Sequence, residues 1–159
     1  MSDSMAQEPR EIQDTIQRVL EQNRLAVLAT QRNAQPHASL IAFTPLEGLR
    51  FLAFATYRHT LKYESIREDR RVAILIEDRE GDARRSGRRL VLTAVGEAIK
   101  MPKEDRQACI ATHLARHPAL EGFLRSPDCE FVRVAVHAYQ VVSGVDDARW
   151  YAIGDLAAA

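Results

Sequence analysis

The chain has 159 residues, of which 46% are hydrophobic and 28% are charged, as is typical of a folded protein with one domain. This length and composition exclude two large domains, a disordered chain and a collagen-like chain. The 22 lysines and arginines balance the 22 aspartates and glutamates, and the formal net charge of +0 argues against a dedicated nucleic-acid-binding protein.

The N-terminal segment and the cysteines indicate the compartment. Residues 1–8 are polar and acidic, without the basic and apolar regions of a secretion signal, and we expect them to form a disordered leader. No stretch is apolar over a membrane-spanning length, so the sequence predicts no membrane partner and a cytoplasmic location. Cys109 and Cys129 have no CxxC spacing, and we expect both to be reduced and structural.

Hydrophobic periodicity predicts a helix followed by a meander of three strands. The helix begins near Pro9, and four apolar residues fall on one of its faces: Ile12, Ile16, Val19 and Leu20. Apolar stretches with polar or Pro- and Gly-containing turns between them then predict strands at residues 25–30, 36–44 and 49–55. These short connections require antiparallel pairing, since a parallel crossover needs a dozen residues or more.

The second half of the chain mixes helices and strands. Gly96 lies inside one predicted strand and indicates a β-bulge. In chain order we expect a helix-containing connection (56–68), a strand (72–76), a charged loop (78–89), a strand (90–99), a helix (103–116), a short helix ending at residue 124, and strands at 131–136 and 139–142. Together these elements predict one mostly antiparallel, barrel-like α+β domain.

The junction between the third strand and the next helix has the composition of a phosphate-binding site. Thr56 and Thr60 supply hydroxyl donors there, and Arg58 and Lys62 supply positive charge. Amides at a helix N-terminus also attract anions. The alternative is a solvated helix face in which one of the threonines only caps the helix, and the residues alone leave both interpretations open.

Three other features are weighed as sites. The arginine-rich residues 79–89 also contain acidic residues and predict a solvated loop. His113 and His117 have the spacing of metal ligands on a helix, but they lack the glutamate of the zinc-protease motif, and we expect no metal site. Trp150 either stacks on a cofactor held by a partner subunit or covers the core.

The order of these segments resembles the pyridoxamine 5′-phosphate oxidase-like family of flavin-binding split barrels. The resemblance covers residues 12–142, and its most specific part is the group of Thr56, Thr60 and Lys62, followed by an apolar strand from Arg71. It implies a single domain from residue 9 to residue 159. The expected fold is α+β and mainly β: a six-stranded antiparallel split β-barrel with flanking helices. It also implies a homodimer with flavin mononucleotide (FMN) bound between the two subunits.

The resemblance assigns site residues one by one. Thr60 and Lys62 would hold the FMN phosphate, and the end of one strand together with part of the preceding strand would line the flavin. The expected cofactor-binding residues are Ser39, Leu40, Ile41, Ala55, Thr56, Arg58, Thr60, Lys62 and Trp150. No side chain is assigned as catalytic, because the flavin itself supplies the redox chemistry.

The chain departs from the vitamin B6 oxidases of this family at phosphate-binding positions. Ser39 and Leu61 stand where those enzymes usually carry arginines, and Arg58 is the cation that would replace part of the missing charge. Their C-terminal Arg-x-His signature has no match in residues 145–151. We therefore do not expect a true pyridoxamine 5′-phosphate oxidase.

Two functions follow as hypotheses. The first is an FMN-dependent oxidoreductase with an unidentified small-molecule substrate or reductant, and a deazaflavin in place of FMN is a variant of it. The second is a non-catalytic protein that binds or carries flavin or haem. Haem-degrading relatives are typically longer, which disfavours haem in a chain of this length.

Overall fold

The computed structural model describes residues 2–79 and 89–157, with side chains from residue 8 to residue 156. Its strands are β1 (Leu25–Arg32), β2 (Gln35–Leu46), β3 (Phe51–Tyr57), β4 (Arg71–Glu77), β5 (Val91–Ile99), β6 (Cys129–Gly144) and β7 (Asp147–Ala152). Its helices are α1 (Ser2–Gln22), α2 (Leu61–Glu68), α4 (Lys103–Arg116), α5 (Glu121–Leu124) and α6 (Ile153–Ala157), with the 3-10 helix η1 (Pro118–Leu120) before α5.

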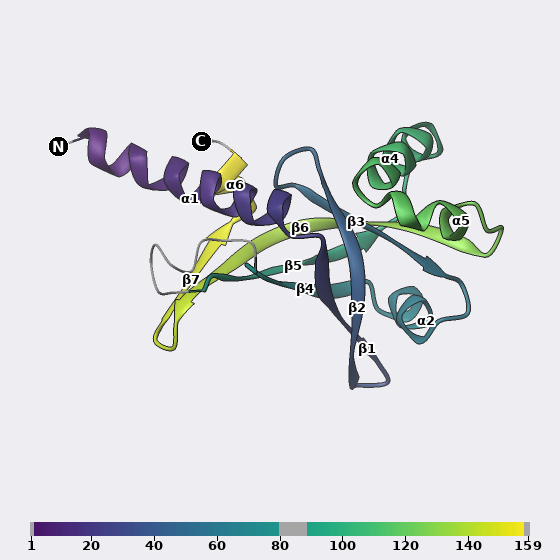
Figure 1. Ribbon diagram of the computed structural model, residues 1–159. Coiled ribbons are helices and arrows are strands. Elements are labelled where there is room, and N and C mark those ends of the chain that lie inside the picture. The colour runs from purple at the N-terminus through teal and green to yellow at the C-terminus, as the bar shows by residue number, and fades with distance from the viewer. Residues whose placement is uncertain (1, 80–88, 158–159) are drawn as a thin grey trace.

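The sheet closes on itself. Six of the seven strands form an antiparallel ring in the order β3-β2-β1-β4-β5-β6, which the pairing of β3 with β6 closes (Figure 1). The first part of β6 pairs with β3 and its last part pairs with β7, so β6 serves both the ring and an added strand. The expected split β-barrel with flanking helices is confirmed, with β7 as an extra strand.

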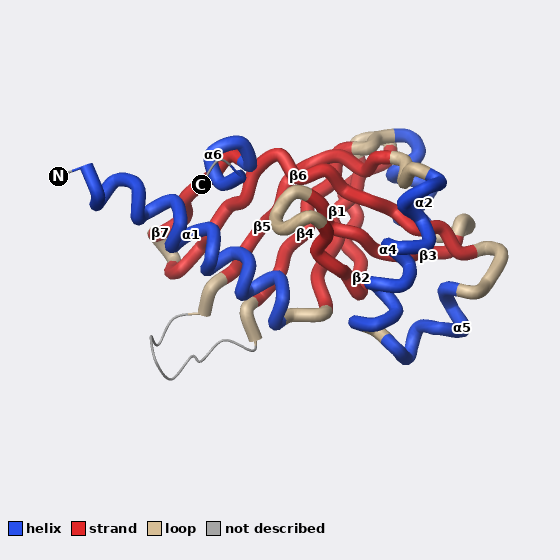
Figure 2. The backbone as a smooth tube through the Cα atoms, turned by 90° about the horizontal axis from the view of Figure 1, so that it is seen from above, coloured by secondary structure: helices blue, strands red, loops and turns tan. Residues whose placement is uncertain are grey.

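The helices lie outside the sheet. Viewed from above, α1 and α6 lie at one end of the molecule, and α2, α4 and α5 lie toward the other (Figure 2). The interior of the barrel comes from strands that bury every second residue, as in β1 and β5. Fully buried side chains of the core include Leu28, Phe43, Ile74, Leu92 and Val134.

Helix α1 packs through the expected stripe. Ile16 and Val19 have no exposed surface, and Leu20 is buried beside them. The helix starts at Ser2, within the segment assigned above to a leader, and Pro9 lies inside it. Good helix formers between Met5 and Glu8 favour this backbone, and disorder of residues 1–8 remains a prediction.

The strand that follows α5 differs from the expectation. In place of two strands, at residues 131–136 and 139–142, β6 runs unbroken from Cys129 to Gly144. Its register against β5 shifts between Val95 and Gly96, which leaves His137 as the extra residue of a bulge. The bulge expected at Gly96 is confirmed, and β6 is paired with β5 on both sides of it.

Neither β7 nor α6 was expected from the sequence. The β7 segment has charged residues among its apolar ones and pairs with the last part of β6. Leu156 of α6 is buried in the core, and α6 packs against α1.

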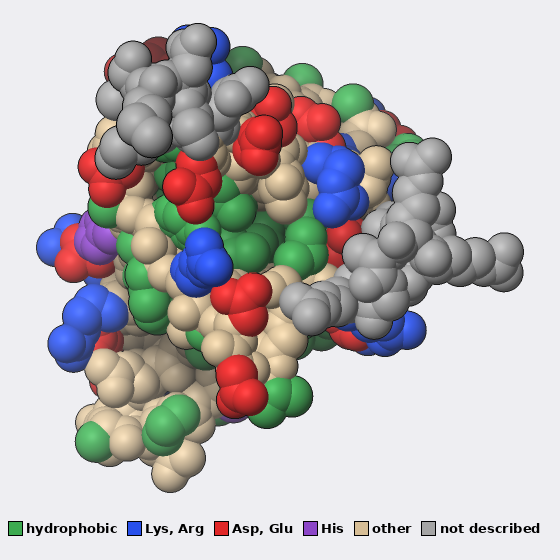
Figure 3. All heavy atoms as spheres, turned by 90° about the vertical axis from the view of Figure 1, so that its left-hand side faces the viewer, with side chains coloured by type: hydrophobic (Ala, Val, Ile, Leu, Met, Phe, Trp, Pro, Cys, Tyr) green, Lys and Arg blue, Asp and Glu red, His purple; other side chains and the backbone are tan. Residues whose placement is uncertain are grey.

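Hydrophobic side chains lie in the middle of the end that Figure 3 shows, with acidic and basic side chains around them. In the part of the chain that the structure describes, no helix has both the length and the apolar character of a membrane span.

Candidate functional site

A cavity of about 240 Å³ opens where β2 and β3 meet α2 and the helices before β6. We call it the β3–α2 cavity. Its lining residues are Leu40, Ile41, Ala42, Ala55, Thr56, Tyr57, Thr60, Lys62, His113, Leu120 and Phe123. Six of the nine expected site residues are therefore together at one place: Leu40, Ile41, Ala55, Thr56, Thr60 and Lys62.

The two threonines form one hydrogen-bonded unit at the start of α2. Thr60 is the N-cap of the helix, and its Oγ1 accepts from the amide of Tyr63 at 3.4 Å. The same hydroxyl lies 2.8 Å from Oγ1 of Thr56 and donates to the carbonyl of Tyr57 at 2.9 Å. Thr60 thus caps the helix and also lines the cavity, so its capping role does not decide between the two interpretations.

The two cations of this segment have different surroundings. Nε of Arg58 lies 2.6 Å from Oε1 of Glu130, and this carboxylate raises the pKa of Arg58 above its ordinary value. Arg58 does not line the cavity. Lys62 does line it, is half-buried, and makes no ion pair with any described residue. Lys62 is thus the cation available to an anion in the β3–α2 cavity.

Ser39 and Trp150 lie elsewhere. Ser39 faces the barrel interior opposite Leu28, because alternate residues of β2 face opposite sides of the sheet. Its Oγ is buried and has no hydrogen-bond partner among the described residues. Trp150 is 56% exposed and belongs to β7, and this strand lies at the opposite end of the molecule from α2 (Figures 1 and 2). Within one chain, neither residue joins the cavity.

One wall of the cavity, provided by the helical segment before β6, was not expected from the sequence. His113, Leu120 and Phe123 come from α4, η1 and α5 and line the cavity together with residues of β2, β3 and α2. Phe123 meets Tyr57 edge to face, with ring centroids 4.6 Å apart. No local pattern signals this wall, because these residues reach the site only when residues 103–124 fold back on β2 and β3.

Arg116 fixes α4 in this position. Its Nε donates to the carbonyl of Phe43 in β2 at 3.1 Å, and its Nη2 donates to the carbonyl of Leu20 at 2.7 Å and also to that of Asn23. The carbonyls of Leu20 and Asn23 lie at the end of α1, where no further helical turn supplies amide donors for them. A single side chain thus joins α4 both to the barrel and to the C-terminal end of α1.

His113 is a fully buried residue of the cavity wall. Its Nδ1 lies 2.7 Å from Oγ1 of Thr44, and its ring meets Phe131 edge to face. Burial lowers the pKa of His113 to about 4, and the neighbouring His117 and Arg116 charges add to this effect. The imidazole is therefore neutral near pH 7.

Each of the two histidines has one ring nitrogen in a hydrogen bond within the fold. Nε2 of His117 donates to the carbonyl of Phe43 at 2.8 Å, and Nδ1 of His113 is occupied by Thr44. Among residues 2–79 and 89–157, no group of three histidine, cysteine or acidic side chains has the arrangement of a metal centre.

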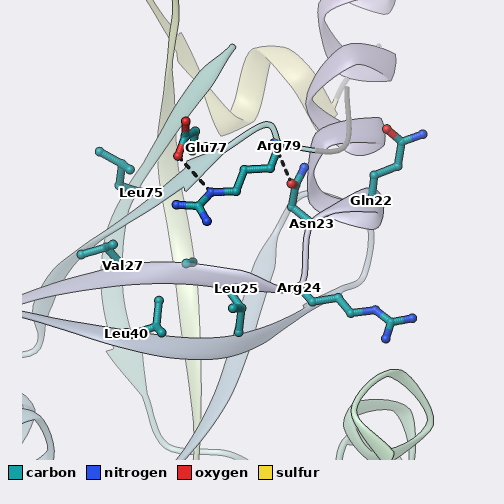
Figure 4. A pocket seen from close by; sticks show the side chains of 10 residues that line it. Gln22, Asn23, Arg24, Leu25, Val27, Leu40, Leu75, Glu77 and Arg79 are labelled. Carbon is teal, nitrogen blue, oxygen red and sulfur yellow. Dashed lines mark hydrogen bonds and ion pairs between the residues drawn. The ribbon is translucent and has the colours of Figure 1, made fainter. Parts of the chain in front are cut away.

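A larger cavity, of about 750 Å³, lies on the outer surface of β1, β2 and β4 (Figure 4). Val27 pairs with Leu40 on one side and with Leu75 on the other, and this row is exposed by 37%, 66% and 40% respectively. Leu25, also exposed, extends the row, and we call these four residues the apolar face. Arg79 borders it, with its Nε bound to Glu77 at 3.1 Å. Leu40 lines both cavities, so the apolar face adjoins the β3–α2 cavity.

The part of the arginine-rich segment that the structure describes is paired. Arg79 and Arg89 both bind Glu77, at 3.1 Å and 2.9 Å. The other arginines of this expected loop fall in residues 80–88 and lie outside the described residues.

Comparison with known proteins gives one family. The model of the family described as pyridoxamine 5′-phosphate oxidase matches residues 12–143. No curated protein matches the chain.

Solved structures share the fold. A heme-binding protein from Mycobacterium smegmatis superposes with a TM-score of 0.80 at 18% identity, over 92% of this chain and 60% of that one. General stress protein 26 from Bacillus anthracis gives 0.67 at 18% identity, over 89% and 98%. An FAD-binding protein from Mesorhizobium loti gives 0.65 at 16% identity, over 79% and 87%. At these identities the likeness concerns the fold alone.

Proposed function

The chain belongs to the pyridoxamine 5′-phosphate oxidase-like family, and on this premise we propose that it is an FMN-binding oxidoreductase acting on a small molecule. The observation that carries the proposal is the composition of the β3–α2 cavity. The end of β3 and the start of α2 supply Lys62 and the hydroxyls of Thr56 and Thr60, and the other lining residues are apolar or aromatic. A ligand that fits has an anionic group at one end and a flat apolar body, as FMN does.

The polar residues of the cavity fit a phosphate. Lys62 has no carboxylate partner among the described residues, so its charge is not neutralised by the protein. The Thr56 and Thr60 hydroxyls, bonded to each other, line the same cavity and can reorient to donate to phosphate oxygens. We assign the phosphate to these three residues.

The apolar part fits a flavin ring. Leu40, Ile41 and Ala55 come from neighbouring strands of the barrel, and Phe123 faces them from α5. Apolar walls of this kind exclude water and bury a planar ring. The bound flavin would supply hydride or electron transfer, while these residues orient it and shield it from water.

We further propose that the protein is a homodimer and that the second copy packs on the apolar face. The β3–α2 cavity, at about 240 Å³, is smaller than the roughly 300–1,000 Å³ of most ligand sites. Leu40 belongs both to this cavity and to the apolar face, so a copy seated there would extend the walls around the cofactor. A contact of Trp150 with the cofactor would come from that second subunit.

The proposal excludes pyridoxamine 5′-phosphate as the substrate. That substrate needs its own cationic phosphate site, and Arg149 is the cation available near the C-terminus. Its Nε lies 3.3 Å from Asp147, and its Nη1 lies 3.9 Å from Glu8. An arginine held by two carboxylates is poorly placed to orient a second phosphate.

We propose a cytoplasmic location for this activity. Cys109 and Cys129 are both free, and burial raises the pKa of each thiol. Unpaired, unreactive cysteines suit a reducing compartment.

The absorption spectrum of the purified protein, before and after addition of FMN, tests the proposal. We expect flavin bands that remain with the protein through gel filtration and bleach when NADH or NADPH is added without oxygen. Flavin bands that no reductant bleaches would favour a flavin carrier. A Soret band, or no retained flavin after incubation with FMN, would contradict the proposal.

A further inference from the structure

The β3–α2 cavity contains one polar group for which the phosphate site has no use. His113 lines the cavity although its side chain has no exposed surface. Its Nε2 is buried and has no hydrogen-bond partner among the described residues. A buried polar atom without a partner is unfavourable, so an atom in this state beside a cavity points to a partner that the ligand brings.

The hydrogen-bond pattern around the ring indicates which role Nε2 takes. The buried hydroxyl of Thr44 has a proton to donate, and Nδ1 of His113 at 2.7 Å is its partner within the described structure. When Thr44 donates to Nδ1, the neutral ring carries its own proton on Nε2. The burial that lowers the pKa of His113 keeps the ring in this neutral form. Nε2 is then a donor without an acceptor.

The neighbouring histidine has its hydrogen bond already. His117 is buried on the same helical segment, and its Nε2 donates to the carbonyl of Phe43 at 2.8 Å. It does not line the β3–α2 cavity. A purely structural role therefore accounts for His117 but leaves Nε2 of His113 unexplained.

We propose that Nε2–H of His113 donates a hydrogen bond to an acceptor atom, a carbonyl oxygen or an unprotonated ring nitrogen, on the heterocycle bound in the β3–α2 cavity. Lys62 and the two threonines then hold the anionic end of the ligand, and His113 selects for a ring that carries a hydrogen-bond acceptor. This inference rests on the proposed function, because it takes the ligand to be a flavin. It makes the helical segment before β6 part of the binding site.

The first test compares FMN binding by three variants with the wild type. His113→Leu removes the donor and is expected to weaken FMN binding about tenfold, the effect of losing one hydrogen bond in a buried site. His113→Gln keeps an N–H donor and is expected to bind more tightly than His113→Leu. His117→Gln, on the same helical segment but outside the cavity, is the matched control and is expected to bind as the wild type does. Thermal unfolding of each variant checks that it is folded.

The second test uses the wild-type protein, so it does not depend on whether a variant without the buried His113 ring still folds. In protein with 15N-labelled histidines, we expect the Nε2 signal of His113 to shift when FMN is added, while that of His117 stays in place. A His113 signal that does not move at saturating FMN would overturn the inference, as would equal FMN affinity in His113→Leu and the wild type. In either case the wild type still binds FMN, and the proposed function stands. A wild-type protein that binds no FMN would remove both proposals.

Discussion

At the scale of single residues, Arg58 and Lys62 illustrate how a partner decides what a cation can bind. Arg58 is committed to Glu130 at 2.6 Å, and Lys62 faces the cavity without an ion pair among the described residues. We expect Arg58→Ala to leave the Kd for FMN within about twofold of the wild-type value, measured by quenching of flavin fluorescence. A tenfold increase in Kd would show that Arg58 leaves Glu130 to hold the phosphate.

His113 gives a prediction for stability against pH. Its pKa is about 4 in the folded protein, against 6.5 for an ordinary histidine. Between these values the unfolded chain binds a proton that the native protein does not bind, so the free energy of unfolding falls as the pH is lowered. The loss from pH 7 to pH 4 should reach about 3 kcal/mol from this residue alone.

Urea unfolding at several pH values measures this contribution. Burial also lowers the pKa of His117, so the comparison that isolates His113 is with His113→Gln. The free energy of unfolding of the variant should depend less steeply on pH between 6.5 and 4. Parallel curves for the variant and the wild type would show that His113 is not the group responsible.

Some residues of the cavity could be predicted from the sequence, and others could not. Thr56, Thr60 and Lys62 lie within seven consecutive positions at a strand-to-helix junction, where local chemistry already suggests an anion site. His113 and Phe123 belong to a segment whose local pattern predicts only helices. Their place in the site depends on how α4 and α5 dock, and an anchor such as Arg116, bonded to carbonyls far away in the sequence, cannot be read from local spacing.

At the scale of elements, the pairing of β5 with β6 depends on one glycine. A Cβ on Gly96 would overlap the carbonyl oxygen of Ala135, and backbone cannot move away as a flexible side chain can. We expect Gly96→Ala to lower the free energy of unfolding by about 3 kcal/mol or more. Gly122→Ala in α5 is the control, because a Cβ added there would meet no neighbouring atom within 4 Å. Equal urea midpoints for the two variants would contradict the close approach.

The strands β5 and β6 show what the sequence pattern can predict and what it cannot. The apolar alternation of β5 predicts a strand, and the glycine within it predicts the bulge. The bulge itself changes the alternation of β6 near His137, so the sequence pattern breaks where the strand does not. Strand β7 gains its pairing from the last part of β6 and has four exposed residues in six, so it carries no strong apolar signal of its own.

At the scale of the whole molecule, the apolar face predicts an assembly. Val27 lies in the centre of the row between Leu40 and Leu75. A carboxylate placed there would be buried without a partner in a dimer that uses this face, so Val27→Asp should shift sedimentation from dimer to monomer. It should also weaken FMN binding, because Val27 does not line the β3–α2 cavity and acts on it only through the second copy.

The control for this prediction is Val145→Asp. Val145 is fully exposed in the turn between β6 and β7, away from the apolar face, and its replacement should change neither the sedimentation nor the FMN affinity. A wild-type monomer that binds FMN tightly would contradict the dimer.

The proposed function depends on the β3–α2 cavity holding a phosphorylated flavin through Lys62, and one set of titrations tests this. Wild-type protein and Lys62→Ala are each titrated with FMN and with riboflavin, which lacks the phosphate; Lys100→Ala, at an exposed position after β5, is the control. We expect the wild type and the control to prefer FMN by about tenfold to a hundredfold, as for one charge-assisted hydrogen bond. In Lys62→Ala that preference should largely disappear, with riboflavin affinity unchanged. A preference for FMN that survives in Lys62→Ala would contradict the assignment of the phosphate to this cavity.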